Sequence, residues 1–232
     1  MRGDGKAAGL RRIVVAGGAG FFGRNVAELL RAEGLRPVTA GRSGELVLDV
    51  EDRASLHRGL RPGDVLVDAA GPFQARGTAL VESALEIGVD VIDLNESLEH
   101  ARRVAAFGER ARQRGIAILS SCSAVSSVAA TLLRLSGVDR PVRVSALVAP
   151  ASRETAHAGT IRALLASVGT PIEVWRDFRA ARVAGWRETR DFALPRRRAH
   201  LVSSALTLTL PEVWPALRVV DCWTDTSTFG AN

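Results

Sequence analysis

Residues 13–23 read IVVAGGAGFFG, in which four apolar residues lead into a glycine-rich turn. A short apolar run bounded by a turn is typical of a buried strand, and the residues after it have the spacing of a helix. Gly18, Gly20 and Gly23 match G-x-G-x-x-G, and Gly17, Gly20 and Gly23 match the related G-x-x-G-x-x-G. The order strand, glycine turn, helix predicts the start of a βαβ unit.

Glycine is required in such a turn for three physical reasons. One position makes the tight turn, one lets the backbone approach a pyrophosphate, and one lets helix and strand pack closely. The helix N-terminus then offers free N–H groups and a partial positive charge to the phosphates. A purely structural turn without a ligand is the alternative. The candidate dinucleotide-binding residues here are Gly17, Gly18, Gly20, Phe21, Phe22 and Gly23.

A basic residue follows the second expected strand, residues 37–40. NAD sites usually place Asp or Glu near this point for the ribose hydroxyls, and the nearest acid is Glu45. Arg42 can instead pair with the 2′-phosphate of NADP, and Ser43 can donate a further hydrogen bond. We therefore expect NADP(H) as the preferred cofactor and NAD(H) as the second option. A solvated surface arginine is the alternative.

Small or acidic residues follow the next two expected strands, 46–48 and 65–69. Asp49 is placed where such folds contact adenine, although an exposed loop aspartate fits equally well. Small residues after the fourth strand leave room for the ribose and nicotinamide half of the cofactor at the carboxyl edge of the sheet. A plain strand-ending turn is the alternative. The candidate cofactor-binding residues at this strand end are Ala70, Gly71, Pro72 and Phe73.

Three substrate-side candidates follow the fifth and sixth expected strands, 89–93 and 116–120. Asp93 and Asn95 are suited to orient a substrate amine or a water, and helix capping is the alternative for Asn95. Cys122 lies between two serines at the same edge, without a neighbouring histidine that would activate it, so a small buried residue is the alternative. No residue is assigned as the catalytic acid or base.

The alternation of these six strands with helical patterns predicts an α/β fold, a doubly wound parallel Rossmann sheet. Beyond it we expect a strand at 142–148, a helix at 160–168 and a hairpin at 174–186, without further βα units. These form a second, smaller α/β or α+β domain. The expected organisation is a flexible tail, a dinucleotide-binding domain and a substrate or lid domain, at residues 1–10, 11–125 and 126–232.

Composition limits the class of protein. The 232 residues are 47% hydrophobic and 24% charged, and no apolar run approaches the roughly 20 residues of a membrane span. Two cysteines are too few for a disulfide framework, so we expect a cytoplasmic protein. The net charge of +6 comes from arginines scattered along the chain, so nucleic acid is not expected as a partner. The four histidines lack metal-ligand spacing, so no metal is expected.

These residues together resemble the saccharopine dehydrogenase-like, or saccharopine reductase-like, family. The resemblance covers about the first 130 residues and rests on the glycine turn and on four further segments, which are Gly41-Arg42-Ser43, Asp68 to Phe73, Gly88 to Leu94 and Ser121-Cys122-Ser123. It implies an NAD(P)-dependent oxidoreductase with an inserted α/β substrate domain, acting on C–N bonds of amino acids or polyamines or on other small unsaturated groups.

Two features depart from that family. Val91 stands where a tyrosine is often found, and family members usually run well past residue 232, which leaves a fragment or a reduced member as options. We therefore expect an NADP(H)-dependent oxidoreductase acting on a small-molecule substrate. The alternative is a catalytically idle NADP-binding sensor or partner protein. A homo-oligomer is compatible with the sequence.

Overall fold

The structure of the protein is a computed structural model, and it describes residues 11–149, 161, 164–165, 167–193 and 196–225. The tail expected at residues 1–10, His157 and part of the helix expected at 160–168 lie outside the described residues. The chain divides into two compact units. The first consists of Met1–Ala70, Gly77–Ile92 and Phe107–Leu119, and the second of Gly71–Arg76, Asp93–Ala106 and Ser120–Asn232.

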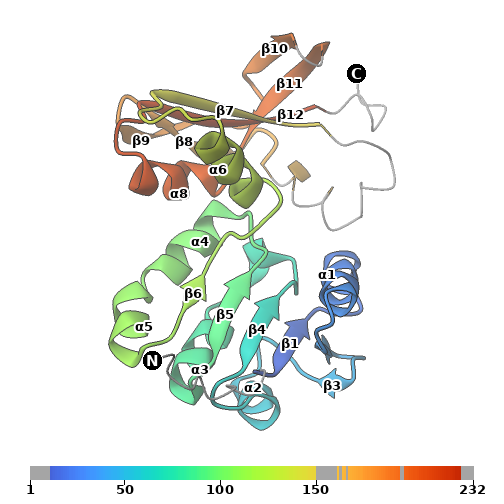
Figure 1. The fold of residues 1–232 in the computed structure, drawn as a ribbon. Coiled ribbons are helices and arrows are strands. Elements are labelled where there is room, and N and C mark those ends of the chain that lie inside the picture. Colours follow the sequence, from blue (N-terminus) through green and yellow to red (C-terminus); the bar gives the residue numbers. More distant parts are fainter. Residues whose placement is uncertain (1–10, 150–160, 162–163, 166, 194–195, 226–232) are drawn as a thin grey trace, which may run out of the picture. The chain divides into compact units, whose positions relative to one another are not determined.

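The first unit contains a six-stranded parallel sheet in the order β3-β2-β1-β4-β5-β6 (Figure 1). Its strands are β1 (Ile13–Ala16), β2 (Val38–Gly41), β3 (Leu46–Val47), β4 (Val65–Asp68), β5 (Asp90–Asp93) and β6 (Ile118–Leu119). The helices of this unit are α1 (Phe21–Ala32), α2 (Arg53–Gly59), α3 (Ala79–Ile87) and α5 (Gly108–Arg114). The expected Rossmann sheet is therefore confirmed.

The strand order reverses on either side of β1, which is the place where open α/β sheets bind ligands. After β1 the chain adds β2 and β3 on one side, then returns to add β4, β5 and β6 on the other. Val14, fully buried in β1, pairs with Val38 of β2 and with Leu66 of β4. Val15 packs with Ala27 of α1 and Val67 of β4. The turn after β1 is thus fixed between two neighbouring strands.

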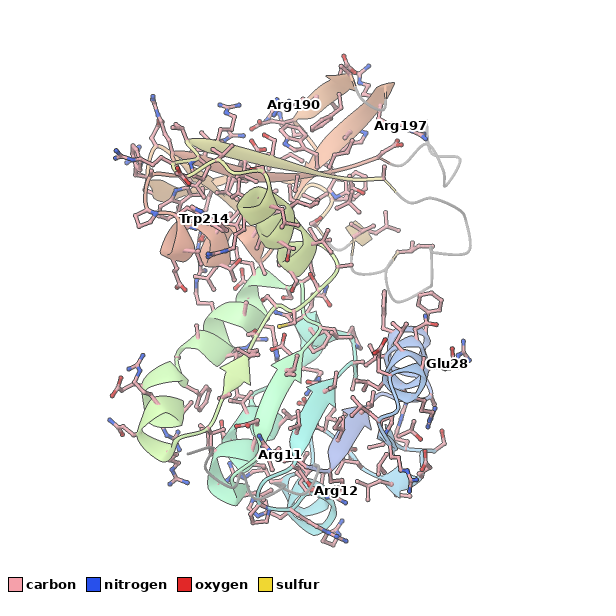
Figure 2. The ribbon with its side chains drawn as sticks, viewed as in Figure 1. Arg11, Arg12, Glu28, Arg190, Arg197 and Trp214 are labelled. Carbon is pink, nitrogen blue, oxygen red and sulfur yellow. The ribbon has the colours of Figure 1, made fainter. Side chains whose placement is uncertain are left out.

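Charged and glycine residues close the opposite end of this sheet. Arg12, before β1, donates to the buried Asp64 before β4, with Nε 2.9 Å from Oδ1, and Arg11 pairs with Asp90 at 2.6 Å (Figure 2). Helix α3 ends at Gly88, whose φ of 92° is left-handed and favours glycine.

The second unit is built around a mixed sheet in the order β10-β11-β12-β8-β9, with β7 also paired to β12. Among the strand pairs described in this sheet, the β7–β12 pair is parallel and the others are antiparallel. Its strands are β7 (Arg143–Val148), β8 (Pro171–Arg176), β9 (Arg179–Ala184), β10 (Thr189–Ala193), β11 (Arg196–Val202) and β12 (Val219–Thr224). Its helical segments are η1 (Phe73–Ala75), α4 (Leu98–Ala105), α6 (Ser126–Leu135) and α8 (Leu206–Val213).

Side chains alternate across this second sheet. Val220 and Cys222 of β12 pack with Leu206 and Leu210 of α8 on one face. Trp223 packs on the other face in a separate core cluster. Both faces of β12 therefore carry buried side chains, and the expected second α+β region is confirmed.

Candidate functional site

The turn after β1 accepts only glycine at its first position. Gly17 has a φ of +73°, and a Cβ atom there would lie 2.8 Å from the backbone of Ala69 and Ala70. The amide of Gly20 donates to the carbonyl of Gly17 at 2.8 Å, which closes the turn. The backbone of Gly17, directly after β1, is consequently in close contact with that of Ala69 and Ala70, directly after β4.

Two further glycines bring the turn against β2 and α1. A Cβ on Gly18 would lie 2.7 Å from Cβ of Thr39, and a Cβ on Gly23 would lie 2.2 Å from the carbonyl oxygen of Gly17. At Gly20 the added atom would meet only that same oxygen, at 3.1 Å. These positions fulfil the close-packing roles that the sequence predicts for the motif.

Helix α1 begins at this turn without a cap from any side chain of the N-cap residue. The N-cap is Gly20, and the first turn contains no acidic residue. The first amides of a helix have no partner within the helix and carry a partial positive charge. Phe21 and Phe22 meet edge to face at 5.2 Å, and Phe22 is half exposed. The arrangement fits the phosphates of a dinucleotide.

The predicted phosphate-recognition residues follow β2. Arg42 and Ser43 are exposed, and Arg42 makes no ion pair or side-chain hydrogen bond with any residue that the structure describes. The nearby acid is already engaged, because Glu45 accepts hydrogen bonds from Oγ1 of Thr39 at 2.8 Å and from its amide at 3.3 Å. These bonds lower the pKa of Glu45. The guanidinium of Arg42 is thus available to a ligand, whereas the carboxylate of Glu45 is already hydrogen-bonded to Thr39.

The other predicted cofactor residues are divided between the units. Asp49 is exposed and accepts from the amide of Glu51 at 2.9 Å, as an aspartate at a turn does. The amide of Ala70 donates to the buried Asp68 at 3.0 Å. Gly71, Pro72 and Phe73 belong to the second unit, where Gly71 and Pro72 are exposed and the ring of Phe73 lies 5.3 Å from that of His100. Their cofactor roles stay predictions.

The three substrate-side candidates form one polar cluster. Oδ1 of Asp93 accepts from the amides of Asn95 at 3.1 Å and Ser121 at 2.7 Å, and the amide of Cys122 donates to the carbonyl of Asp93 at 2.8 Å. Asp93 is buried, and its Oδ2 has no hydrogen-bond partner among the described residues. Ser121 has a positive φ of 61°, which is uncommon for serine. Strain and an unpaired buried oxygen at one strand end are typical of functional sites.

The side chain of Asn95 organises the loop before α4 and does not cap that helix. Its Oδ1 accepts from the amide of Ser97 at 2.7 Å, and its Nδ2 donates to the carbonyl of Ser97 at 3.0 Å. Ser97 is the N-cap itself and accepts from the amide of His100. Cys122 is partly buried, and burial together with the charge of Asp93 raises the pKa of its thiol. A thiol of raised pKa is a weak nucleophile at neutral pH.

Sequence reasoning missed a second cluster, centred on Glu96. Its carboxyl group accepts from the hydroxyls of Ser123, Ser126 and Ser204 and from the amide of Ala205, at 3.2 Å for the amide. Burial raises the pKa of Glu96 more than these hydrogen bonds lower it. The donors lie far apart in the sequence, so no local pattern could have indicated that they share an acceptor.

The same serines cap two helices. The hydroxyl of Ser123 accepts from the amides of Val125 and Ser126 at the start of α6, at 3.1 and 3.0 Å. The hydroxyl of Ser204 accepts from the amide of Leu206, the first residue of α8, at 3.1 Å. Serine before a helix is a recognisable capping signal. Through the two hydroxyls, Glu96 ties the starts of α6 and α8 together.

Two further classes of site receive no support from the described part of the chain. Among those residues, no three or more His, Cys, Asp or Glu side chains are grouped so that they could hold a metal ion. Within the same ranges, every helix is too short or too polar to cross a bilayer.

Comparison with known proteins shows the fold. No family model matches the chain. A Caenorhabditis elegans protein described as "Lipid droplet localized protein" is 28% identical over 137 residues, and the match covers 47% of this chain and 32% of that protein. The chain therefore matches about a third of that relative.

A solved structure matches over most of the chain. The apo saccharopine dehydrogenase (L-Glu forming) of Saccharomyces cerevisiae superimposes with a TM-score of 0.52 at 13% identity, covering 93% of this chain and 55% of that one. This chain thus spans about half of the yeast enzyme. The protein shares the fold of that dehydrogenase, as the resemblance in its sequence implied.

Proposed function

We propose that the protein binds NADP(H) at the N-terminus of α1 and is an oxidoreductase acting on a small molecule. One observation carries the proposal: α1 begins at a glycine turn without a capping side chain or an acidic residue, next to the strand that Arg42 follows. A helix N-terminus of this kind binds phosphate through backbone amides. An unpaired guanidinium after the neighbouring strand adds a partner for a second phosphate.

Several residues of the first unit have a proposed role in binding the cofactor. The amides of Phe21, Phe22 and Gly23 face the pyrophosphate, Arg42 and Ser43 bind the 2′-phosphate, and Asp49 and Ala70 border the adenosine and ribose. When bound, the nicotinamide supplies hydride transfer. Asp93 and Asn95 stay candidates for orienting the substrate.

The proposed reaction class comes from the resemblance in sequence together with the shared fold. The yeast protein is named for the oxidation of saccharopine, and the family implied by the sequence acts on C–N bonds. We accordingly propose oxidation of a secondary amine, or the reverse reduction of an imine, as the first class of substrates to screen. At 13% identity this match supports the fold alone. The class of substrate is part of our proposal.

Calorimetric titration with NADPH and NADH tests the cofactor assignment. We expect Arg42→Ala to weaken NADPH binding about 10- to 100-fold and to leave NADH binding unchanged, because only NADPH carries the 2′-phosphate. Arg58→Ala is the matched control, since Arg58 is an exposed arginine of the same unit, with 72% of its side chain accessible, on α2. Equal losses for both cofactors, or binding of neither by the wild type, would overturn the assignment.

A second candidate function is an NADP(H) sensor without catalysis. The observation that favours it lies in the polar cluster of Asp93, Asn95 and Cys122. There Oδ1 of Asp93 already accepts from two backbone amides, and the pKa of the Cys122 thiol is raised. Stopped-flow absorbance at the NADPH band, recorded with amine and imine substrates, separates the candidates. Tight binding without turnover across the screen would favour the sensor.

We propose the cytoplasm as the place where the protein acts. Imaging of a fluorescent fusion in the source cells tests this. A diffuse signal is the expected result, whereas concentration on lipid droplets, the site in the name of the C. elegans relative, would contradict it.

A further inference from the structure

A cavity of about 720 Å³ lies on the sheet of the second unit. Val219, Asp221 and Trp223 of β12 line it, whereas Val220 and Cys222, which alternate with them, pack with α8. Because successive side chains of a strand point to opposite faces, the cavity opens on the face of β12 turned away from α8. Its volume is that of a pocket for a small metabolite.

Four guanidinium groups and three carboxylates line this cavity, which leaves one excess positive charge. Arg176 pairs with Glu188 through two bonds of 3.1 and 2.7 Å, and Arg218 pairs with Asp177 at 2.6 Å. The third carboxylate, Asp221, is buried and accepts from Nε1 of Trp223 at 2.7 Å. It also acts electrostatically on Arg176. Two of the carboxylates are therefore ion-paired, and the third is hydrogen-bonded to Trp223.

The remaining two guanidinium groups, of Arg143 and Arg190, have no carboxylate partner among the described residues. Arg190 of β10 (Figure 2) reaches across the sheet so that Nη1 donates to Oγ of Ser145 on β7 at 2.7 Å. On the way it lies over the rings of Phe192 and Trp223, with Cζ 5.0 and 6.0 Å from the two centroids. This packing holds the guanidinium in place before any ligand arrives.

Arg143 lies on the same face of the same strand as Ser145, because the two residues are separated by one. Arg143 is exposed and has no side-chain hydrogen bond or ion pair with the described residues. Two arginines without an ion-pair partner among the described residues thus line one cavity with one excess positive charge, and one of them is fixed by aromatic rings and a hydroxyl. An oxyanion bound there would neutralise the excess positive charge and accept from the planar forks of both arginines.

We propose that this cavity binds a small metabolite through a carboxylate or phosphate group held by Arg143 and Arg190. A carboxylate and a phosphate share one chemistry, because each is an oxyanion that accepts paired N–H hydrogen bonds. All the residues involved belong to the second unit. The proposal therefore stands apart from the dinucleotide site on α1.

Calorimetric titration of the full chain with inorganic phosphate and with succinate, at matched ionic strength, tests the proposal. We expect saturable binding of at least one probe with a dissociation constant of about 1 mM or lower, weakened about tenfold by Arg143→Gln and by Arg190→Gln. Binding of phosphate alone or of succinate alone assigns the group. Arg179→Gln, on an exposed arginine of β9 that does not line the cavity, should change nothing.

Arg42→Ala separates this site from the one on α1, since phosphate bound at α1 would respond to that variant. Tryptophan fluorescence checks that the sheet of the second unit is intact in the Arg190→Gln variant. Arg143→Gln tests the same site at an exposed residue, where the substitution is not expected to disturb the fold. Absence of saturable binding by both probes would overturn the proposal, and so would binding that both variants retain.

Discussion

The N-terminus of α1 differs from those of α6 and α8 in what pairs with the first backbone amides of the helix. Every helix begins with unpaired amides and a partial positive charge. At α6 and α8, Ser123 and Ser204 accept from these amides and donate in turn to Glu96. At α1 the N-cap is Gly20, which has no side chain to accept from them. The difference indicates which helix start is closed by the protein and which is open to a ligand.

Removal of the shared acceptor should give the largest effect. In Glu96→Leu, three hydroxyls and one amide lose their acceptor in a partly buried place, so we expect the free energy of unfolding to fall by about 3 kcal/mol or more. Urea unfolding followed by tryptophan fluorescence measures it, because all four tryptophans belong to the second unit. The exposed Glu212→Gln is the control. A loss below about 1 kcal/mol would show that the cluster is not a structural tie.

A methyl group in the glycine turn tests the open helix start. In Gly23→Ala the new Cβ would lie 2.2 Å from the carbonyl oxygen of Gly17, so the turn must move. We expect NADPH binding to weaken by about 100-fold or more, measured by calorimetry. The control is Gly108→Ala, where the added atom meets nothing within 4 Å. Unchanged affinity in Gly23→Ala, with circular dichroism showing an intact fold, would mean that the turn does not hold the cofactor.

A smaller effect, in the pH dependence of stability, reports the charge of Glu96. Burial raises its pKa above the ordinary 4.5, so the folded state keeps this proton at pH values where the unfolded chain has lost it. The contribution of Glu96 to stability is then complete below pH 4.5 and falls as the pH rises through the folded pKa.

The non-titrating Glu96→Gln variant isolates this dependence. Relative to it, the wild type should lose free energy of unfolding as the pH is raised from 4.5 toward neutrality, in the same urea and fluorescence measurement. A wild-type advantage that grows with pH would mean that the hydrogen bonds outweigh burial and that the carboxylate is the stable form.

The first unit could be predicted from the sequence because its signals are local. The glycines from Gly17 to Gly23 lie within one short segment between the first strand and the first helix, as the motif predicts. Boundaries were less accurate at the sheet edges: β6 is Ile118–Leu119 where 116–120 was expected, since an edge strand pairs only on one side.

The second unit could be predicted only in part because its interactions join distant residues. The hairpin of β8 and β9 was expected, as was β7. Strands β10, β11 and β12 were not assigned, since residues 187–225 show no alternation of strand and helix patterns that would give βα units. Glu96 and Ser204 are 108 residues apart, and Arg190 and Ser145 are 45 apart. Such pairs become visible only when the sheet is assembled.

Backbone amide NMR of the labelled protein, recorded with and without NADPH, tests the central contrast most directly. We expect large shifts for the amides of Phe22 and Gly23, at the open start of α1, and none for those of Ser126 and Leu206, which serine hydroxyls already bind. Shifts confined to α6 and α8, or none at α1 under saturating NADPH, would contradict it.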